Sequence, residues 1–132
     1  MIVVDASAMV EALIGRDADP ELLDALADDL HAPHLLDVEV LSVLRGLTLA
    51  GKLVGPAADD ARADYFALTI VRHEIEALAD RVWELRQNFT TYDAAYLSLA
   101  EALGAPLLTC DHKLIGTAHR ADVRVFPRAG TA

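Results

Sequence analysis

The sequence predicts an α/β protein, a three-layer α/β/α sandwich with a central, mostly parallel sheet. Short apolar runs rich in β-branched residues alternate along the chain with stretches whose apolar residues recur at helical spacing. Because helices separate single strands, neighbouring strands need crossover connections, which make them parallel. The 132 residues, 54% hydrophobic and 24% charged, are expected to form one compact domain spanning residues 1–132.

The expected strands are short runs dominated by Val, Ile and Leu. The first of them passes directly into Asp5, and the second is at most brief. The predicted strands cover residues 2–4, 31–33, 70–72, 106–110 and 123–126.

The expected helices begin at capping or proline residues and end at glycines. Two helices open with a first-turn proline, at Pro20 and Pro56. Three end at a glycine, namely Gly15, Gly51 and Gly104. The predicted helices cover residues 8–14, 20–30, 36–50, 55–66, 75–86 and the stretch from Thr90 to Gly104, with a short helix beginning at Asp111.

The start of the chain and its cysteine content indicate a cytoplasmic protein. Met1 leads into an apolar strand without the basic start or long apolar stretch of a signal peptide. No run approaches the roughly 18 apolar residues of a membrane span. The single cysteine cannot form an internal disulfide, which suits a reducing compartment. We therefore expect no membrane association.

The net charge of −10 argues against non-specific electrostatic binding of nucleic acid, but the charge is unevenly distributed. Residues 1–66 hold 13 Asp and Glu and 4 Lys and Arg, a balance of −9, whereas residues 67–132 hold 8 and 7, a balance of −1. Any phosphate contacts are therefore expected from cations of the second half, most of which should be solvated surface residues. These cations are Arg72, Arg81, Arg86, Lys113, Arg120, Arg124 and Arg128.

Two acids stand where predicted strands end. Asp5 follows residues 2–4 and Asp111 follows residues 106–110. Ligands of such folds collect beyond the carboxyl ends of the strands, and these two strands should be neighbours. Each acid could instead simply cap the helix that follows it.

Two further acids are expected on inward helix faces. Asp93 lies in a mostly apolar helical run, although Thr90 and Asp93 also have the spacing of a capping box. Glu39 lies at the edge of the apolar stripe of its helix, although it could be a boundary residue whose carboxylate reaches water. Its rival Asp37 faces outward with Arg45 and looks like an ordinary surface acid.

Four carboxylates that converge without a Lys or Arg among them would repel one another unless a cation were bound. Hard divalent cations with oxygen ligands fit this set, and Mg²⁺ or Mn²⁺ fits better than zinc because no Cys/His cluster is present.

The chain resembles a PIN-domain ribonuclease, and most of all the toxin subunit of VapBC-type toxin-antitoxin pairs. Matching segments span nearly the whole chain in the order and spacing of that family. They are Ile2-Val-Val-Asp5-Ala-Ser7, Glu39 within Asp-Val-Glu-Val-Leu-Ser-Val-Leu-Arg45, Thr91-Tyr-Asp93-Ala-Ala-Tyr96-Leu-Ser-Leu-Ala100, and Leu107-Leu-Thr109-Cys-Asp111-His-Lys-Leu114.

The resemblance implies a PIN-like fold and an acidic quartet that binds Mg²⁺ or Mn²⁺, formed by Asp5, Glu39, Asp93 and Asp111. It implies that Ser7 and Thr109 support these ligands. Many relatives carry a further acid where this chain has Lys113, so whether the site binds one ion or two stays open.

The implied reaction is metal-dependent hydrolysis of an RNA phosphodiester by an activated water, leaving a 5′-phosphate and a 3′-hydroxyl. The substrate could be tRNA, rRNA or mRNA. The resemblance also implies a homodimer, and a cognate antitoxin whose tail covers the site with an inserted arginine. Arg86 and Lys113, which lie near the acid motifs in sequence, are our candidate RNA contacts.

Other interpretations stay open. An inactive PIN-like binding module would bind metal without turnover, and a metal-dependent phosphatase of the haloacid dehalogenase type would need Asp-x-Asp where this chain has Asp5-Ala-Ser7. A phospho-receiver is disfavoured because residues 47–55 contain no acid. Four weaker signals are interpreted as structural: the His31 and His34 pair, the Cys110 thiol, the Trp83 and Tyr92 rings, and Tyr96, with the aromatic rings expected in the core or an interface.

Overall fold

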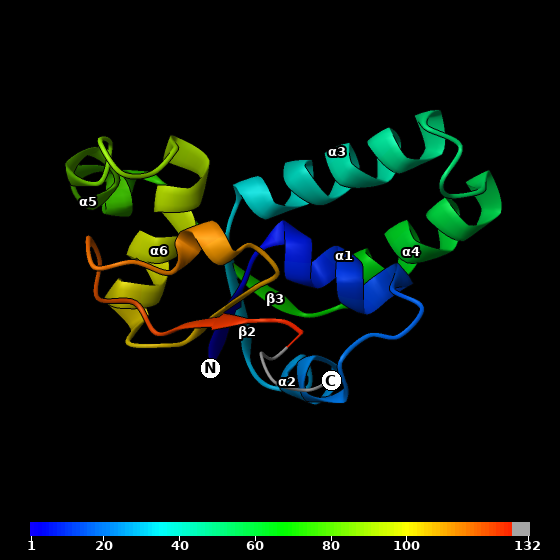
Figure 1. Cartoon of the computed structure of the whole chain (residues 1–132), viewed down its shortest axis with the longest axis horizontal. Coiled ribbons are helices and arrows are strands. Elements are labelled where there is room, and N and C mark those ends of the chain that lie inside the picture. The colour runs from blue at the N-terminus through cyan, green and yellow to red at the C-terminus, as the bar shows by residue number, and fades with distance from the viewer. Residues whose placement is uncertain (128–132) are drawn as a thin grey trace.

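A computed structural model describes residues 1–127 and contains a five-stranded sheet, in the order β3-β2-β1-β4-β5, whose neighbouring strands are all parallel (Figure 1). The strands are β1 (Ile2–Val4), β2 (Leu30–Pro33), β3 (Ile70–His73), β4 (Leu107–Thr109) and β5 (Val123–Val125). The predicted α/β class and parallel sheet are therefore confirmed. Arg128, one of the cations counted above, lies outside the described residues.

Helices cover both faces of this sheet. They are α1 (Ala6–Ile14), α2 (Pro20–Ala25), α3 (Leu35–Leu49), α4 (Gly55–Ala67), α5 (Ala79–Glu84) and α6 (Thr91–Leu103), with 3₁₀ turns at Glu76–Leu78 and His112–Leu114. Helices α1, α3 and α4 contact one another on one side, whereas α5 packs on α6 on the other (Figure 1). Helices α3 and α4 form a long antiparallel pair that extends beyond the sheet.

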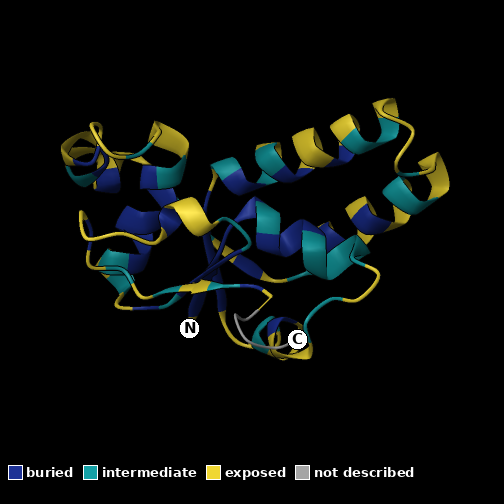
Figure 2. Ribbon diagram, viewed as in Figure 1, coloured by how far each residue is buried: buried dark blue, intermediate teal, exposed yellow. Residues whose placement is uncertain are grey.

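Helix α6 is the most deeply buried helix segment of the described chain. Residues 94–100 are buried on every side, between the strands β1, β2 and β4 and the helix α5 (Figure 2). Leu97 and Leu99 are almost fully buried, and each such leucine contributes roughly 1.5–3 kcal/mol relative to an exposed one. The first turn of α6 is thereby held rigidly against the carboxyl ends of the strands.

The strand order reverses beside β1 and β4. The chain moves outward from β1 to β2 and β3, and then returns across the sheet to β4, so that the crossovers leave in opposite directions at this point. Val4 pairs with Leu108, and the Asp5 amide continues the ladder by donating to the Leu108 carbonyl at 3.1 Å. The expectation that the strands preceding Asp5 and Asp111 are neighbours is confirmed, and this is where open parallel sheets bind ligands.

Two predicted helices differ from the structure. The second ends at Ala25 and not near Leu30, because Leu30 is needed to pair with Ile2 in the sheet. The intervening Asp28 and Asp29 are also unfavourable at the negative end of a helix. The stretch 75–86 divides into a 3₁₀ turn and the short helix α5, a common arrangement at a helix start that still buries Leu78 and Val82.

Within residues 1–127, no helix combines the length and the apolar character that crossing a bilayer requires.

Candidate active site

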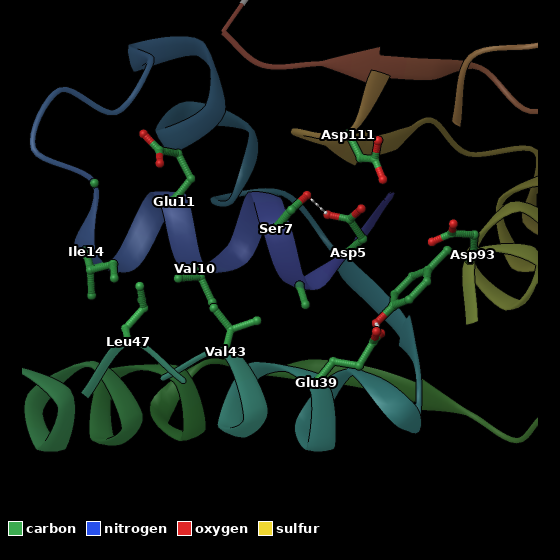
Figure 3. Close-up of a pocket in the computed structure, with 13 residues that line it drawn as sticks. Asp5, Ser7, Val10, Glu11, Ile14, Glu39, Val43, Leu47, Asp93 and Asp111 are labelled. Carbon is green, nitrogen blue, oxygen red and sulfur yellow. Dashed lines mark hydrogen bonds between the residues drawn. The ribbon is translucent and has the colours of Figure 1, made fainter. Parts of the chain in front are cut away.

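A cavity of about 560 Å³ opens at the carboxyl ends of β1 and β4, between helices α1, α3 and α6 (Figure 3). The four acids predicted from the sequence all line it: Asp5, Glu39, Asp93 and Asp111. In Figure 3 the carboxylates of Asp5, Asp93 and Asp111 lie together at one end, with Glu39 opposite them on α3. Four segments far apart in sequence thus meet at one place.

Asp5 is 7% exposed and is held by three donors. Its Oδ1 accepts from the Ser7 hydroxyl at 2.7 Å and from the Ala8 amide at 3.0 Å, and its Oδ2 accepts from the Thr109 hydroxyl. Burial raises the pKa of Asp5, although the three hydrogen bonds oppose that rise. Asp5 therefore both caps α1, as one interpretation proposed, and lines the cavity.

Ser7 and Thr109 connect Asp5 to the segment that follows β4. Their hydroxyl oxygens lie 3.2 Å apart, and Ser7 Oγ also accepts from the Cys110 amide at 2.8 Å. Thr109 Oγ1 accepts from the Asp111 amide at 3.0 Å. Ser7 therefore contacts the Asp5 side chain, and Thr109 contacts both the Asp5 side chain and the Asp111 backbone. Ser7 lines the cavity, whereas Thr109 does not.

Glu39 reaches the cavity from α3 and is half-buried. Its Oε1 accepts from the Tyr96 hydroxyl at 2.6 Å. Burial raises the pKa of Glu39, the Tyr96 hydrogen bond lowers it, and repulsion from Asp5 and Asp93 raises it further. Burial also raises the pKa of Tyr96, so that its hydroxyl remains a donor.

The interpretation of Asp37 as an ordinary surface acid was wrong. Its Oδ1 accepts from the Tyr65 hydroxyl of α4 at 2.6 Å, and its Oδ2 accepts from Arg72 Nε of β3 at 2.9 Å. Asp37 therefore ties three elements together outside the cavity, and Arg72 is a paired structural cation.

Asp93 and Asp111 lie near each other at one end of the cavity (Figure 3). The Asp93 amide donates to the Thr90 hydroxyl at 3.1 Å, so the capping bond is present while the carboxylate lines the cavity. Burial raises the pKa of Asp93, Thr90 and Lys113 lower it, and repulsion from Asp111 adds to the rise. Lys113 Nζ lies 3.9 Å from Asp111 Oδ2, and its side chain is 84% exposed.

Arg86 is not among the residues that line the cavity. Its guanidinium lies 4.9 Å from the ring centroid of Trp83 and donates to the Trp83 carbonyl. Trp83 is 68% exposed and Tyr92 63%, so neither ring lies in the core of this chain, whereas Tyr96 is buried.

His31 and His34, interpreted as structural, have different surroundings. His31 Nδ1 lies 2.8 Å from His73 Nε2, and its Nε2 lies 2.9 Å from Asp29 Oδ2. His34 instead occupies the N-cap of α3.

Sequence reasoning missed Glu11 and the apolar wall of the cavity. Glu11 lies one helical turn beyond Ser7 on the same face of α1, and that spacing could have revealed it. The wall lies between α1 and α3 and is formed by Val10, Ile14, Val43 and Leu47 (Figure 3).

The donor set of the cavity fits a hard divalent cation. None of the described residues that line it carries a basic side chain, while five of them are acids. Among residues 1–127, no three acidic, histidine or cysteine side chains are already arranged around one ion position. Oxygen-only donors and the repulsion among these acids favour Mg²⁺ or Mn²⁺.

Comparison with known proteins agrees with this geometry. The model of the PIN domain family matches residues 2–120. Ribonuclease VapC9 of Mycobacterium tuberculosis is 41% identical over 131 residues, which are 97% of this chain and 100% of that protein. Ribonuclease VapC12 of the same species is 32% identical, covering 95% of this chain and 98% of that protein.

Two solved structures share the fold. PAE2754 from Pyrobaculum aerophilum has a TM-score of 0.68 at 19% identity, covering 92% of this chain and 81% of that one. VapC20 of Mycobacterium tuberculosis, described as a sarcin-ricin loop cleaving toxin, has a TM-score of 0.59 at 16% identity, covering 86% and 92%. The match to the family model and the identity to the two ribonucleases show that the chain belongs to the PIN-domain family, and within it to the VapC proteins.

Proposed function

We propose that this chain is a divalent-metal-dependent endoribonuclease that acts as the toxin of a toxin-antitoxin pair. The observation that carries the proposal is the convergence of four carboxylates on one cavity at the reversal point of the sheet, with no basic residue among the described residues that line it. Relatives that are 41% and 32% identical over nearly the whole chain are ribonucleases by name, which supports the reaction class.

The proposed roles follow from position. Asp5, Asp93 and Asp111 would hold Mg²⁺ or Mn²⁺, and Glu39 would bind the ion or orient the attacking water. When bound, the ion lowers the pKa of water and stabilises the charge that develops on the phosphate.

Several of the chain's own groups would prepare the site. Ser7 and Thr109 hold Asp5 in one orientation, because they donate to different oxygens of its carboxylate. Lys113, exposed at the rim beside Asp111, is a candidate contact for an RNA phosphate. Arg86 stays a weaker prediction, since it lies outside the cavity lining.

The cavity also suits an antitoxin segment. Its acids would receive an arginine, and its wall of Val10, Ile14, Val43 and Leu47 would bind apolar side chains. A toxin-antitoxin complex from Klebsiella pneumoniae shares the fold, with a TM-score of 0.58 at 17% identity. We further propose a homodimer, because Val38, Leu41 and Phe66 leave exposed apolar surface on the α3 and α4 pair. We also propose that the protein is cytoplasmic, because its single cysteine, Cys110, is free and would stay reduced there.

The test is cleavage of a pool of tRNA, rRNA and mRNA by antitoxin-free protein with Mg²⁺, Mn²⁺ or EDTA. We expect cutting with either ion, none with EDTA, and 5′-phosphate ends. Asp93→Asn should abolish cutting, whereas Asp80→Asn, which changes an exposed acid of α5, should leave it unchanged. A folded wild type that binds Mn²⁺ but cuts none of these RNAs would instead identify a binding module.

A further inference from the structure

The Tyr96 hydroxyl lies at the junction of the two helices that carry Asp93 and Glu39. Tyr96 follows Asp93 by three residues on α6, so both side chains lie on one face of that helix. Its ring is buried, and its hydroxyl donates at 2.6 Å to Oε1 of Glu39, which stands 57 residues away on α3. Tyr96 also lines the cavity.

Glu39 needs such a partner more than the other acids of the cavity do. A glutamate has three rotatable side-chain bonds, and ordering it lowers its conformational entropy. Asp5 and Asp93 are close enough to repel the Glu39 carboxylate. Glu39 is half-buried at the edge of the buried face of α3, so its side chain can reach solvent. Without a donor inside the cavity, the carboxylate would turn outward to water.

We infer that Tyr96 is a positioning residue, which holds Oε1 of Glu39 so that the second carboxylate oxygen stays available to the ion or water in the cavity. This inference rests on the proposed function, because it assigns Tyr96 a role in assembling that site. Tyr96 acts through Glu39 and not by contact with the substrate. A hydroxyl donor that orients a ligand from outside is the type of partner whose loss weakens metal binding.

The chain provides a matched control in Tyr65. Its buried hydroxyl also donates at 2.6 Å to a carboxylate of α3, that of Asp37. Tyr65 does not line the cavity. Removing either hydroxyl deletes the same kind of bond to the same helix, but only the Tyr96 bond ends on an acid of the site.

The experiment measures Mn²⁺ affinity by isothermal titration calorimetry on antitoxin-free wild type, Tyr96→Phe and Tyr65→Phe, with thermal unfolding of each ion-free protein. We expect Tyr96→Phe to bind Mn²⁺ about 10-fold more weakly or worse, and Tyr65→Phe to bind it as the wild type does. Both variants should lose several degrees of Tm, which separates a role in the site from general stability.

Two further variants test whether Tyr96 acts through Glu39. In a Glu39→Ala background, Tyr96→Phe should weaken Mn²⁺ binding no further, because the shared bond is already gone. Replacement of Tyr96 by p-aminophenylalanine restores a donor at the same place, and it should recover most of the lost affinity. This replacement also gives a result if Tyr96→Phe folds poorly.

The outcomes are distinguishable. If the folded wild type binds no Mn²⁺, the proposed function fails and the inference with it. If the wild type binds Mn²⁺ and Tyr96→Phe binds it equally well, or if Tyr65→Phe weakens binding as much, the positioning role alone is overturned. An equal loss in the Glu39→Ala background would likewise show that Tyr96 acts by another route.

Discussion

Replacing Asp37 by alanine is expected to destabilise the protein strongly, although the residue lies outside the cavity. Asp37 joins α3 to the Tyr65 hydroxyl of α4 and to the guanidinium of Arg72 on β3. Partial burial raises the pKa of Asp37, but hydrogen bonds from Arg72 and Tyr65 outweigh it and hold the pKa below the ordinary value of 3.8. The carboxylate is therefore charged at neutral pH and contributes to stability as an ion.

The magnitude follows from the groups left behind. Hydrogen bonds to a charged acceptor contribute about 1.5–3 kcal/mol each, and an unsatisfied buried hydroxyl costs about 1–3 kcal/mol. Tyr65 is 0% exposed, so its hydroxyl depends on Asp37 as an acceptor within the protein. Because these contributions overlap, we expect Asp37→Ala to lower the free energy of unfolding by about 3 kcal/mol, which corresponds to roughly 10 °C in Tm.

Urea denaturation followed by circular dichroism measures this loss. Asp59→Ala is the control, since Asp59 pairs with Arg62 on the surface of α4, with side chains 72% and 56% exposed, and such pairs contribute about 0.5 kcal/mol or less. The Asp37 contribution should be present above the ordinary carboxyl pKa and be lost as the pH falls through its lowered value. A loss below about 1 kcal/mol for Asp37→Ala would restore the interpretation of a surface acid.

Two further predictions follow from raised pKa values. The pKa values of Asp5, Glu39 and Asp93 are raised, first by burial, so their protonated forms favour the fold. The free energy of unfolding of the ion-free protein should then fall as the pH rises from about 4 through these pKa values. Asp93→Asn should raise the free energy of unfolding of the ion-free protein by about 1 kcal/mol at pH 7, and it should abolish the stabilisation by Mn²⁺. Thermal unfolding with and without the ion measures both effects. An Asp93→Asn protein less stable than the wild type would contradict this. Burial raises the pKa of Cys110 to about 11, so iodoacetamide at pH 7.5 should modify its thiol about 100-fold more slowly than a free cysteine, and labelling at the free rate would refute that environment.

The spacing of apolar residues, together with the glycines, prolines and capping residues at element ends, predicted most of the fold, because the strands and helices here are short and clearly bounded. Glycines at 51 and 104 have positive φ just beyond α3 and α6, where L side chains are strained, so these two helix ends were readable from the residue type. The end of α2 was not readable, because pairing in the sheet decides it. Leu30 has the apolar character that either a helix or a strand accepts, and only its partner Ile2 selects the strand.

The acids at the strand ends could be placed from the sequence because strand order and connection handedness constrain where strands end. The partners of the helix acids could not. Glu39 and Asp37 lie two residues apart, and the side chains that distinguish them come from residues 57 and 28 to 35 positions away. Helical spacing indicates a direction, but not whether a tyrosine or an arginine will be found there.

Electrostatics separates the two kinds of acid after folding. Among the carboxyl groups of residues 1–127, those with raised pKa values are Asp5, Glu39 and Asp93, and all three line the cavity. Those with lowered pKa values each have a cationic partner: Asp28 has the N-terminal amine, Asp37 has Arg72 and Glu101 has Arg81. The fold thus neutralises the acids that hold its elements together, whereas the only cation beside the acids of the cavity in residues 1–127 is Lys113, whose side chain is 84% exposed and does not line the cavity. Such an arrangement opposes folding in the ion-free state, and it is expected only where a bound cation, or an arginine from a partner, completes the site.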